Sequence, residues 1–430
     1  MKTDQIQKVH KDWYKLDLSA IVYPTLQRRD FSSVYRLSVL LKEDIDPEIL
    51  QRAVNLTMPR FPTFKAAIRK GVFWRYLEPN DRPGPFVQED VKNPCQPMHF
   101  KGNNRYLVRI YYYRNRIALE AHHSLGDGTG GMCVLQTLTA TYLRLKGHSE
   151  IENGGLVLDI LGIPDPGELE DAYMKYANAK VCPPRPGEKT YRVRGTKEPF
   201  YTLNIIDGIM SVSEVMRVAK SYNATITEYL NSVLLYALMQ KQESEWHWKL
   251  RPVKIAMPVN LRRFFPSRTL RNFITMIYPG IDPRLGEYTF EEIVTQVHNY
   301  MRYYLNEKLL RGDITTNAET QRNPFIRIVP LFIKDLVVRQ FYTKIQDKNS
   351  SAGLTNMGAL KVPETMKPYI ERFDIYMGQP FSTRTNCAIA SFEDILTINF
   401  ASSIAETDVE RLFFRKLVQD GIHVKIESNR

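Results

Sequence analysis

The chain has 430 residues and a formal net charge of +12 at pH 7, with 43% hydrophobic and 25% charged residues. This length predicts two domains or one large two-lobed fold, and the ordinary composition excludes a fibrous or disordered class. The positive charge favours acidic partners, but no DNA- or RNA-binding motif accompanies the scattered Lys and Arg residues, so nucleic acid is a poor candidate.

The cysteine spacing and the length of the apolar runs disfavour further classes of protein. Cys95, Cys133, Cys182 and Cys387 are far apart and form no C-x-x-C pair, so neither a zinc site nor a disulfide framework is predicted. Residues 1–18 lack the apolar core of a signal peptide, and no run of about 18 apolar residues predicts a membrane span. A cytoplasmic location is the default expectation.

The first third of the chain predicts a mixed α/β fold. Ser33–Leu41 and Gly71–Leu77 are rich in β-branched, aromatic and apolar residues, which is typical of strands. Between them, Asp46 and Pro47 predict the start of a helix, because Asp is a favoured N-cap and Pro suits the first helical position.

Two further strands and a helix follow. Arg105–Tyr113 and Arg116–His123 predict strands joined by a tight turn. After Gly128 the apolar residues change to helical spacing, and this pattern ends near Gly147.

Residues 182–199 (CPPRPGEKTYRVRGTKEP) are rich in Pro, Gly and charge and predict a linker. They divide the chain into an N-terminal lobe, residues 1–181, and a C-terminal lobe, residues 200–430. In the second lobe, capping-box patterns are typical of helix starts at Thr225-x-x-Glu228 and Thr407-x-x-Glu410. The remaining elements predicted there are strands at Phe200–Ile206, Lys254–Val259 and Ile395–Phe400 and a helix at Ser211–Lys220.

The chemistry is concentrated in residues 122–128, HHSLGDG, between a predicted strand and a predicted helix. Because strand side chains alternate, His122 and His123 should face opposite sides, with His123 on the face of the apolar Ile117. A partly buried neutral imidazole at that position could accept a proton. Asp127 could cap the next helix or form an ion pair.

Simpler interpretations of the same residues stay open. A histidine at a strand end is usually structural. A metal site would need a third ligand, which is not obvious here. A serine hydrolase is less favoured because no G-x-S-x-G elbow is present.

HHSLGDG resembles the HHxxxDG signature of the superfamily shaped like chloramphenicol acetyltransferase. That superfamily includes condensation domains of peptide synthetases, plant BAHD acyltransferases, polyketide-associated acyltransferases and alcohol acetyltransferases. The plant-type D-F-G-W-G motif is missing, so the BAHD branch itself is disfavoured.

Other segments resemble the same superfamily. Met257–Arg262 (MPVNLR) is similar to its P-V-N-x-R segment, and Thr269–Phe273 (TLRNF) to its G-N-F segment, with Arg271 in place of the usual glycine. Thr355–Gly358 (TNMG) is similar to its S-N-x-G stretch. The opening WYKLD and the ending VKIESN look like bacterial proteins grouped with alcohol acetyltransferases.

The resemblance implies an α/β fold of two similar lobes with an active-site tunnel between them. It implies that His123, the second histidine of the motif, is the general base, and that Asp127 is mainly structural and pairs with Arg262. It also implies acyl transfer from a thioester, acyl-coenzyme A (acyl-CoA) or acyl-phosphopantetheine, to an alcohol or amine. No metal and no bound cofactor are needed.

Two sets of site residues are left open by the sequence. The oxyanion donor could be Asn272, Thr355 or Asn356, although each could equally be a backbone-capping residue. Anionic donor groups could meet Arg263, Arg268 and Arg271, or these could lie on a solvated loop. Arg262 cannot both hold Asp127 and bind phosphate.

Three functions are therefore compared. The favoured one is an acyltransferase that uses acyl-CoA. The others are a condensation-type enzyme that takes its donor from an acidic acyl carrier protein, and a non-catalytic binding module.

Residues 325–342 (FIRIVPLFIKDLVVRQFY) mix apolar and basic residues. This stretch predicts a core element with a basic outer face, or else a surface that touches a membrane or admits a lipid-like acyl chain.

Overall fold

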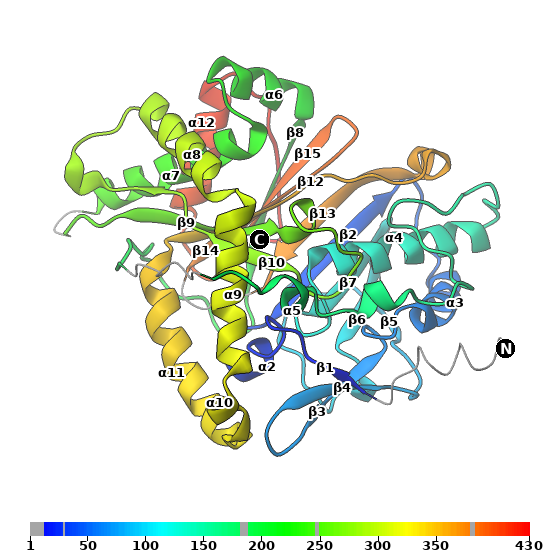
Figure 1. The fold of residues 1–430 in the computed structure, drawn as a ribbon. Coiled ribbons are helices and arrows are strands. Elements are labelled where there is room, and N and C mark those ends of the chain that lie inside the picture. The colour runs from blue at the N-terminus through cyan, green and yellow to red at the C-terminus, as the bar shows by residue number, and fades with distance from the viewer. Residues whose placement is uncertain (1–12, 29–30, 181–187, 246–248, 379–382) are drawn as a thin grey trace.

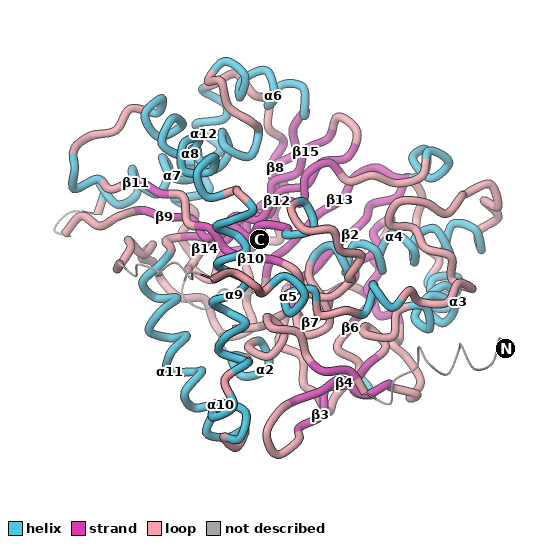
Figure 2. The backbone as a smooth tube through the Cα atoms, in the orientation of Figure 1, coloured by secondary structure: helices cyan, strands magenta, loops and turns pink. Residues whose placement is uncertain are grey.

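The computed structural model describes residues 13–28, 31–180, 188–245, 249–378 and 383–430. Within these residues the strands form three sheets, and most of the helices lie around the outside of the strands (Figure 1, Figure 2). This arrangement confirms the predicted α/β class. No helix in the described part of the chain is long and apolar enough to cross a bilayer.

A five-stranded sheet forms the centre of the N-terminal half. In spatial order its strands are β13 (Ile370–Met377), β2 (Val34–Leu41), β7 (Arg116–His122), β6 (Val108–Tyr113) and β5 (Val87–Glu89). Helix α4 (Gly128–Leu145) packs on β2 and β7, and α3 (Pro47–Thr57) packs on α4. The Asp46 side chain accepts hydrogen bonds from two backbone amides of α3, as its N-cap position predicts.

An eight-stranded sheet forms the centre of the C-terminal half. Its path runs β10 (Ile274–Ile277), β9 (Val253–Asn260), β12 (Ala352–Ala359), β14 (Thr385–Phe392), β15 (Ile395–Ser402), β8 (Asn204–Ser211) and β16 (Lys425–Ser428), with β11 (Gly280–Ile281) on β9. Four helices belong to the same half of the chain as this sheet: α6 (Val212–Ser221), α7 (Ile226–Ser244), α8 (Phe290–Tyr304) and α12 (Asp408–Gln419). The third sheet is small and consists of β1 (Tyr14–Lys15), β4 (Arg75–Pro79) and β3 (Ala66–Lys70).

The remaining helices include two pairs whose contacts join the N-terminal and C-terminal halves of the chain. They are α2 (Tyr23–Leu26), α5 (Ala172–Tyr176), α9 (Glu307–Arg322), α10 (Pro324–Ile328) and α11 (Leu331–Asn349). Helix α5 packs on α9, and α11 packs on α2. Segments that are far apart in the sequence therefore lie side by side.

Strand β13 links the two halves of the chain. It comes from residues 370–377 but pairs antiparallel with β2 in the N-terminal sheet. It also contacts β14 and β15 of the C-terminal sheet. The division at residues 182–199 stays a prediction; residues 182–187 of that segment lie outside the described residues.

Three local predictions are corrected by the structure. The strand expected at Gly71–Leu77 starts only at Arg75, because residues 71–74 make the hairpin turn, closed by a hydrogen bond from the Gly71 amide to the Trp74 carbonyl (2.8 Å). The strand expected at Phe200–Ile206 starts at Asn204, after a turn in which the Thr202 amide donates to the Pro199 carbonyl.

The third correction concerns the last helix. The Thr225 capping box of α7 is present, but Thr407 makes no side-chain capping bond at the start of α12. Glu410 instead turns into the core, where it accepts a hydrogen bond from Thr385 Oγ1 (3.2 Å), and burial raises its pKa to about 7.

Candidate active site

A cavity of about 2450 Å³ is lined by residues of both large sheets. Tyr35 and Tyr376 contribute from the five-stranded sheet, and Met257 and Thr355 from the eight-stranded sheet. His123 lies on the same lining. This cavity is larger than the roughly 300–1,000 Å³ of ordinary small-molecule sites, so it has room for two substrates or for one long one.

His123 is the first residue after strand β7. Its backbone amide donates to the Ser33 carbonyl (2.8 Å), which continues the pairing with β2 by one residue. Its ring stacks on the ring of Tyr23, with the centroids 4.8 Å apart, and packs against the tilted ring of Tyr35, with the centroids 4.6 Å apart. Nδ1 is buried and has no hydrogen-bond partner among the described residues. Packing against these two aromatic rings therefore helps to hold the imidazole in place.

His122 lies on the other side of the strand end, as the alternation predicts. It is fully buried and is not on the cavity lining. Its Nε2 pairs with Gln27 Oε1 (3.1 Å), and its Nδ1 accepts from the Ser124 amide (3.2 Å). The structure thus confirms the expected orientation of both histidines.

Burial lowers the pKa of both rings. The pKa of His123 falls from 6.5 to about 4, although the Asp127 charge and the Asn272 side chain act in the opposite direction. The pKa of His122 falls to about 3, because of burial and the neighbouring His123. Both imidazoles are neutral near pH 7, so His123 can accept a proton there.

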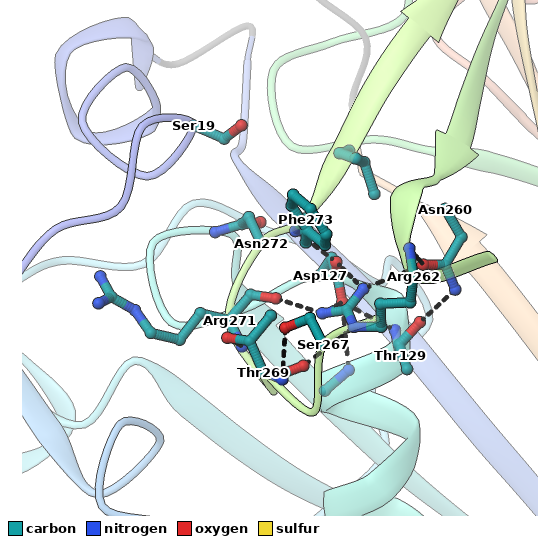
Figure 3. Close-up of polar contacts among 12 residues, drawn as sticks. Ser19, Asp127, Thr129, Asn260, Arg262, Ser267, Thr269, Arg271, Asn272 and Phe273 are labelled. Carbon is teal, nitrogen blue, oxygen red and sulfur yellow. Dashed lines mark hydrogen bonds and ion pairs between the residues drawn. The ribbon is translucent and has the colours of Figure 1, made fainter. Parts of the chain in front are cut away.

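Asp127 is the N-cap of helix α4 and the centre of a polar cluster (Figure 3). Its carboxylate accepts from the backbone amides of Thr129 and Gly130, and from the amide of Phe273 (2.9 Å). Arg262 adds two charge-assisted bonds, Nη1 to Oδ2 at 2.8 Å and Nη2 to Oδ1 at 3.3 Å. The ion pair that the resemblance implies is present, and it joins α4 to the segment between β9 and β10.

Arg262 has no donor left for a substrate. Besides Asp127, its guanidinium donates to the carbonyls of Thr269 (2.9 Å) and Arg271 (2.6 Å) and to Asn260 Oδ1 (3.2 Å). Figure 3 shows the side chain enclosed by the loop that follows it. These contacts fit a positioning role for Arg262.

Glycines allow the two segments to come this close. A Cβ on Gly130 would clash with the carbonyl oxygen of Leu270, and one on Gly128 would approach Met357 Sδ to 2.9 Å. Gly128 also lines the cavity beside His123. The glycine of the HHxxxDG motif therefore keeps the start of α4 free of side chains at the cavity wall.

The three oxyanion candidates have different surroundings. Asn272 is buried, and its amide nitrogen donates to the carbonyl of His123 (2.9 Å) and to the carboxylate of Asp17 (3.0 Å). The Asn356 amide nitrogen donates to Thr227 Oγ1 (2.8 Å), and its oxygen accepts from the Gly358 amide. Thr355 lies on the cavity lining. The amide nitrogen of Asn272 already donates to two groups, whereas that of Asn356 donates to one and keeps a second N–H. Asn356 also lies on the cavity lining, which leaves Thr355 and Asn356 as the candidates.

We expect Asn272→Ala to lower the free energy of unfolding by about 1–3 kcal/mol, because the buried Asp17 carboxylate loses a hydrogen-bond donor. Burial already raises the pKa of Asp17, although Arg271 and Asn272 act against it. Urea denaturation would measure the change. An Asn272→Ala chain of unchanged stability but much lower turnover would instead assign Asn272 to oxyanion binding.

The predicted donor-binding arginines do not lie together. Arg263 is exposed and lies on the cavity lining. Arg268 is 81% exposed, is not on that lining, and pairs with Asp165 at 3.5 Å. Arg271 is buried: its Nη2 donates to the Lys15 carbonyl (2.5 Å), and its Nε lies 3.6 Å from Asp17 Oδ2. The prediction for Arg271 is therefore wrong, because a buried, paired guanidinium cannot reach a substrate phosphate.

Four contributors to the site were missed in the sequence. Tyr35 lies in a strand that was predicted, but its contact with His123 depends on pairing with β7. Asp17 belongs to the WYKLD segment, whose resemblance could have drawn attention to it. Asn260, which bonds both Arg262 and Thr129 Oγ1, lies within the P-V-N-x-R-like segment. Tyr23 carried no sequence signal.

Metal ligation is not suggested by the geometry. In the described ranges, no group of three His, Cys, Asp or Glu side chains could hold a metal ion. Cys95, Cys133 and Cys387 are free and buried, whereas Cys182 lies outside the described residues.

Comparison with known proteins finds similarity in structure but not in sequence. No family model and no curated protein matches the chain. TRI101 of F. graminearum, solved with coenzyme A and T-2 mycotoxin, aligns with a TM-score of 0.61 at 10% identity over 96% of this chain and 99% of that one. Polyketide synthase associated protein 5 of Mycobacterium tuberculosis aligns with a TM-score of 0.59 at 13% identity over 95% and 97%.

A mutant starter condensation domain of rhizomide synthetase RzmA, in complex with C8-CoA, gives a TM-score of 0.59 at 12% identity over 98% of this chain and 100% of that one. These alignments cover nearly the whole of each chain, so they include both sheets and the cavity between them. The chain therefore has the two-lobed fold that acetyltransferases of the chloramphenicol acetyltransferase type share with condensation domains.

Proposed function

We propose that the chain transfers an acyl group from a thioester to an alcohol or amine, with His123 as general base. The observation that carries the proposal is the position of His123: a neutral imidazole on the wall of a large cavity, beside the Asp127–Arg262 pair. The fold is compatible with this chemistry, since one structural neighbour was solved with coenzyme A and another with C8-CoA.

The proton and the electron pairs follow a simple path. His123 takes the proton from the acceptor hydroxyl or amine as its oxygen or nitrogen attacks the thioester carbonyl. The tetrahedral oxyanion then collapses, the C–S bond breaks, and the thiolate leaves with the proton that His123 has held. Asp127 is saturated with hydrogen bonds and holds the loop of His123 in place, so it takes no part in the proton transfer.

Charge within the cavity is balanced during this reaction. The imidazolium is disfavoured in the empty site, but the negative oxyanion that forms with it offsets the cost of burying a positive charge. Thr355 is the proposed oxyanion donor and Asn356 the alternative, because both lie on the lining. No metal and no covalent enzyme intermediate are required.

The donor is proposed to be acyl-CoA, with an acyl-carrier protein as the alternative. Arg263 is an exposed cation on the cavity lining, where it can meet the phosphates of coenzyme A or of a phosphopantetheine arm. The net charge of +12 suits either donor. A non-catalytic binding module is less favoured, since a decayed site need not keep His123, Asp127 and Arg262 in these contacts.

A thiol-release assay tests the proposal directly. The full chain would be given acyl-CoA thioesters of increasing length and, in parallel, an acyl-carrier protein thioester, each with pooled alcohols or pooled amines. Release that depends on the acceptor supports acyl transfer. Turnover with acyl-carrier protein alone would move the donor assignment to the condensation type, and no turnover with either donor would favour the binding module.

We expect Arg263→Glu to raise the KM for acyl-CoA several-fold and to leave the acceptor KM nearly unchanged. The reversal puts a like charge beside the donor phosphates, and added salt should shrink the effect. Arg268→Glu is the matched control, because Arg268 is an exposed neighbour that is not on the cavity lining. Equal effects of both variants would indicate a general surface charge rather than a donor contact.

The rate should stay flat as the pH falls from about 8 to 5 and then drop with an apparent pKa near 4, because kcat/KM follows the neutral form of His123. An acid limb near 6.5 would contradict the buried environment of the ring. The free energy of unfolding should also decrease as the pH falls from about 6.5 to about 4. In this interval the unfolded chain binds a proton at His123, whereas the folded chain binds it only near pH 4. Circular dichroism at each pH separates unfolding from titration.

A further inference from the structure

An exposed apolar surface forms where the turn of the β3–β4 hairpin meets α10 and the start of α11. Its side chains are 37% to 77% exposed, and we call them the apolar tip: Val72, Phe73, Trp74, Phe325, Ile328, Phe332, Leu336 and Val337. Figure 1 shows the hairpin and α10 together at the lower edge of the molecule. Scattered apolar residues are normal on a protein surface, but exposed apolar side chains gathered on neighbouring elements indicate a contact site.

Hydrogen bonds make the tip one surface rather than two. The Leu331 amide donates to the Val72 carbonyl (2.9 Å), and Lys334 Nζ donates to the Phe73 carbonyl (2.9 Å). The start of α11 is thus fixed to the hairpin turn. The exposed apolar side chains of the two elements are presented together.

The charges around the tip are positive. Lys70, Arg322 and Arg327 are exposed beside it. Asp335 is the only acidic residue in residues 322–340, and its carboxylate is neutralised by Arg75, with Nη1 2.8 Å from Oδ1. The apolar side chains therefore lie within a basic border, which complements an anionic surface.

The tip is also continuous with the cavity. Phe73, Trp74 and Val337 are exposed and at the same time belong to the lining that includes His123. The cavity of about 2450 Å³ therefore reaches the surface at the tip. An apolar molecule bound at the tip would be at an entrance to the candidate site.

We infer that the apolar tip docks on an anionic lipid bilayer. The tip consists of the hairpin turn, α10 and the start of α11, which lie together at the lower edge of the molecule (Figure 1) and can meet a bilayer surface at the same time. Bulky aromatic and aliphatic side chains bordered by Lys and Arg are the composition of interfacial membrane contacts. Docking depends on these surface residues alone, so it does not rest on the proposed acyl transfer.

Vesicle sedimentation with the full chain tests the inference. The chain should bind phosphatidylcholine vesicles that contain phosphatidylserine more tightly than pure phosphatidylcholine vesicles. Phe325→Ser/Phe332→Ser should lower the partition coefficient about tenfold or more, because two inserted rings are lost. The matched control is Leu161→Ser/Leu285→Ser, which removes two exposed apolar residues that are not on the tip and should leave binding unchanged.

Fluorescence quenching by brominated lipids locates the contact. Wild-type quenching should fall in Trp74→Phe, while that variant still sediments with the vesicles. Arg322→Glu/Arg327→Glu should remove the preference for anionic vesicles. The inference is overturned if wild-type chain stays in the supernatant, or if the Ser variants bind as the wild type does. Loss of self-association in the Phe325→Ser/Phe332→Ser variant, with no change in vesicle binding, would assign the tip to a second copy of the chain.

Discussion

His123→Ala should abolish nearly all acyl transfer while the chain stays folded. General-base catalysis typically contributes about 10²–10⁴-fold to the rate. The fold should tolerate the change, because the His123 ring already borders the cavity and its Nδ1 has no partner among the described residues. Turnover and melting temperature would be measured on the same preparation.

His122→Ala is the matched comparison for this experiment. His122 is fully buried and bonds Gln27 and the Ser124 amide, so its loss should lower the melting temperature. The folded fraction should keep much of its activity, since His122 is not on the cavity lining. A His122 variant without activity, together with an active His123→Ala chain, would reverse the assignment of the base.

Asp127→Ala should destabilise the chain by about 3–5 kcal/mol, as expected when one partner of a buried ion pair is removed. The Arg262 charge is then left without its partner, and helix α4 loses its N-cap. The amide of Phe273 also loses its acceptor. Chemical denaturation would measure the loss, and Arg268→Ala, which breaks only an exposed pair, should stay near the wild-type value.

A double variant distinguishes the loss of the Asp127–Arg262 ion pair from the loss of any other role of Asp127. Asp127→Ala/Arg262→Met removes both charges, so it should be more stable than Asp127→Ala alone. Activity should remain low, because the loop that carries His123 has lost its anchor. An Asp127→Ala chain with an unchanged melting point but no activity would give Asp127 a direct part in the chemistry.

Much of the region around residues 122–128 could be predicted from the sequence, because its signals are local. Strand alternation separated His122 from His123, and the position of Asp127 before a helical pattern indicated an N-cap. The Asp127–Arg262 contact joins residues 135 positions apart, so it was accessible only through the resemblance. The structure shows that the two side chains meet.

The errors come from contacts made between distant segments. The sequence predicts Arg271 to be an exposed cation, but it is buried and contacts Lys15 and Asp17 near the N-terminus. Glu410 fits a capping pattern, yet its side chain is buried and accepts a hydrogen bond from Thr385. The pairing of β13 with β2 likewise depends on strands more than 300 positions apart along the chain. Local periodicity carries no information about such partners.

The most direct test of the account measures both products of one reaction. Free coenzyme A and acylated acceptor would be quantified together, by thiol trapping and mass spectrometry, for wild type and His123→Ala with the same acyl-CoA. The account predicts equal amounts of the two products from the wild type and only traces of either from His123→Ala. Coenzyme A released without acylated acceptor, or equal product from both chains, would contradict His123-catalysed acyl transfer.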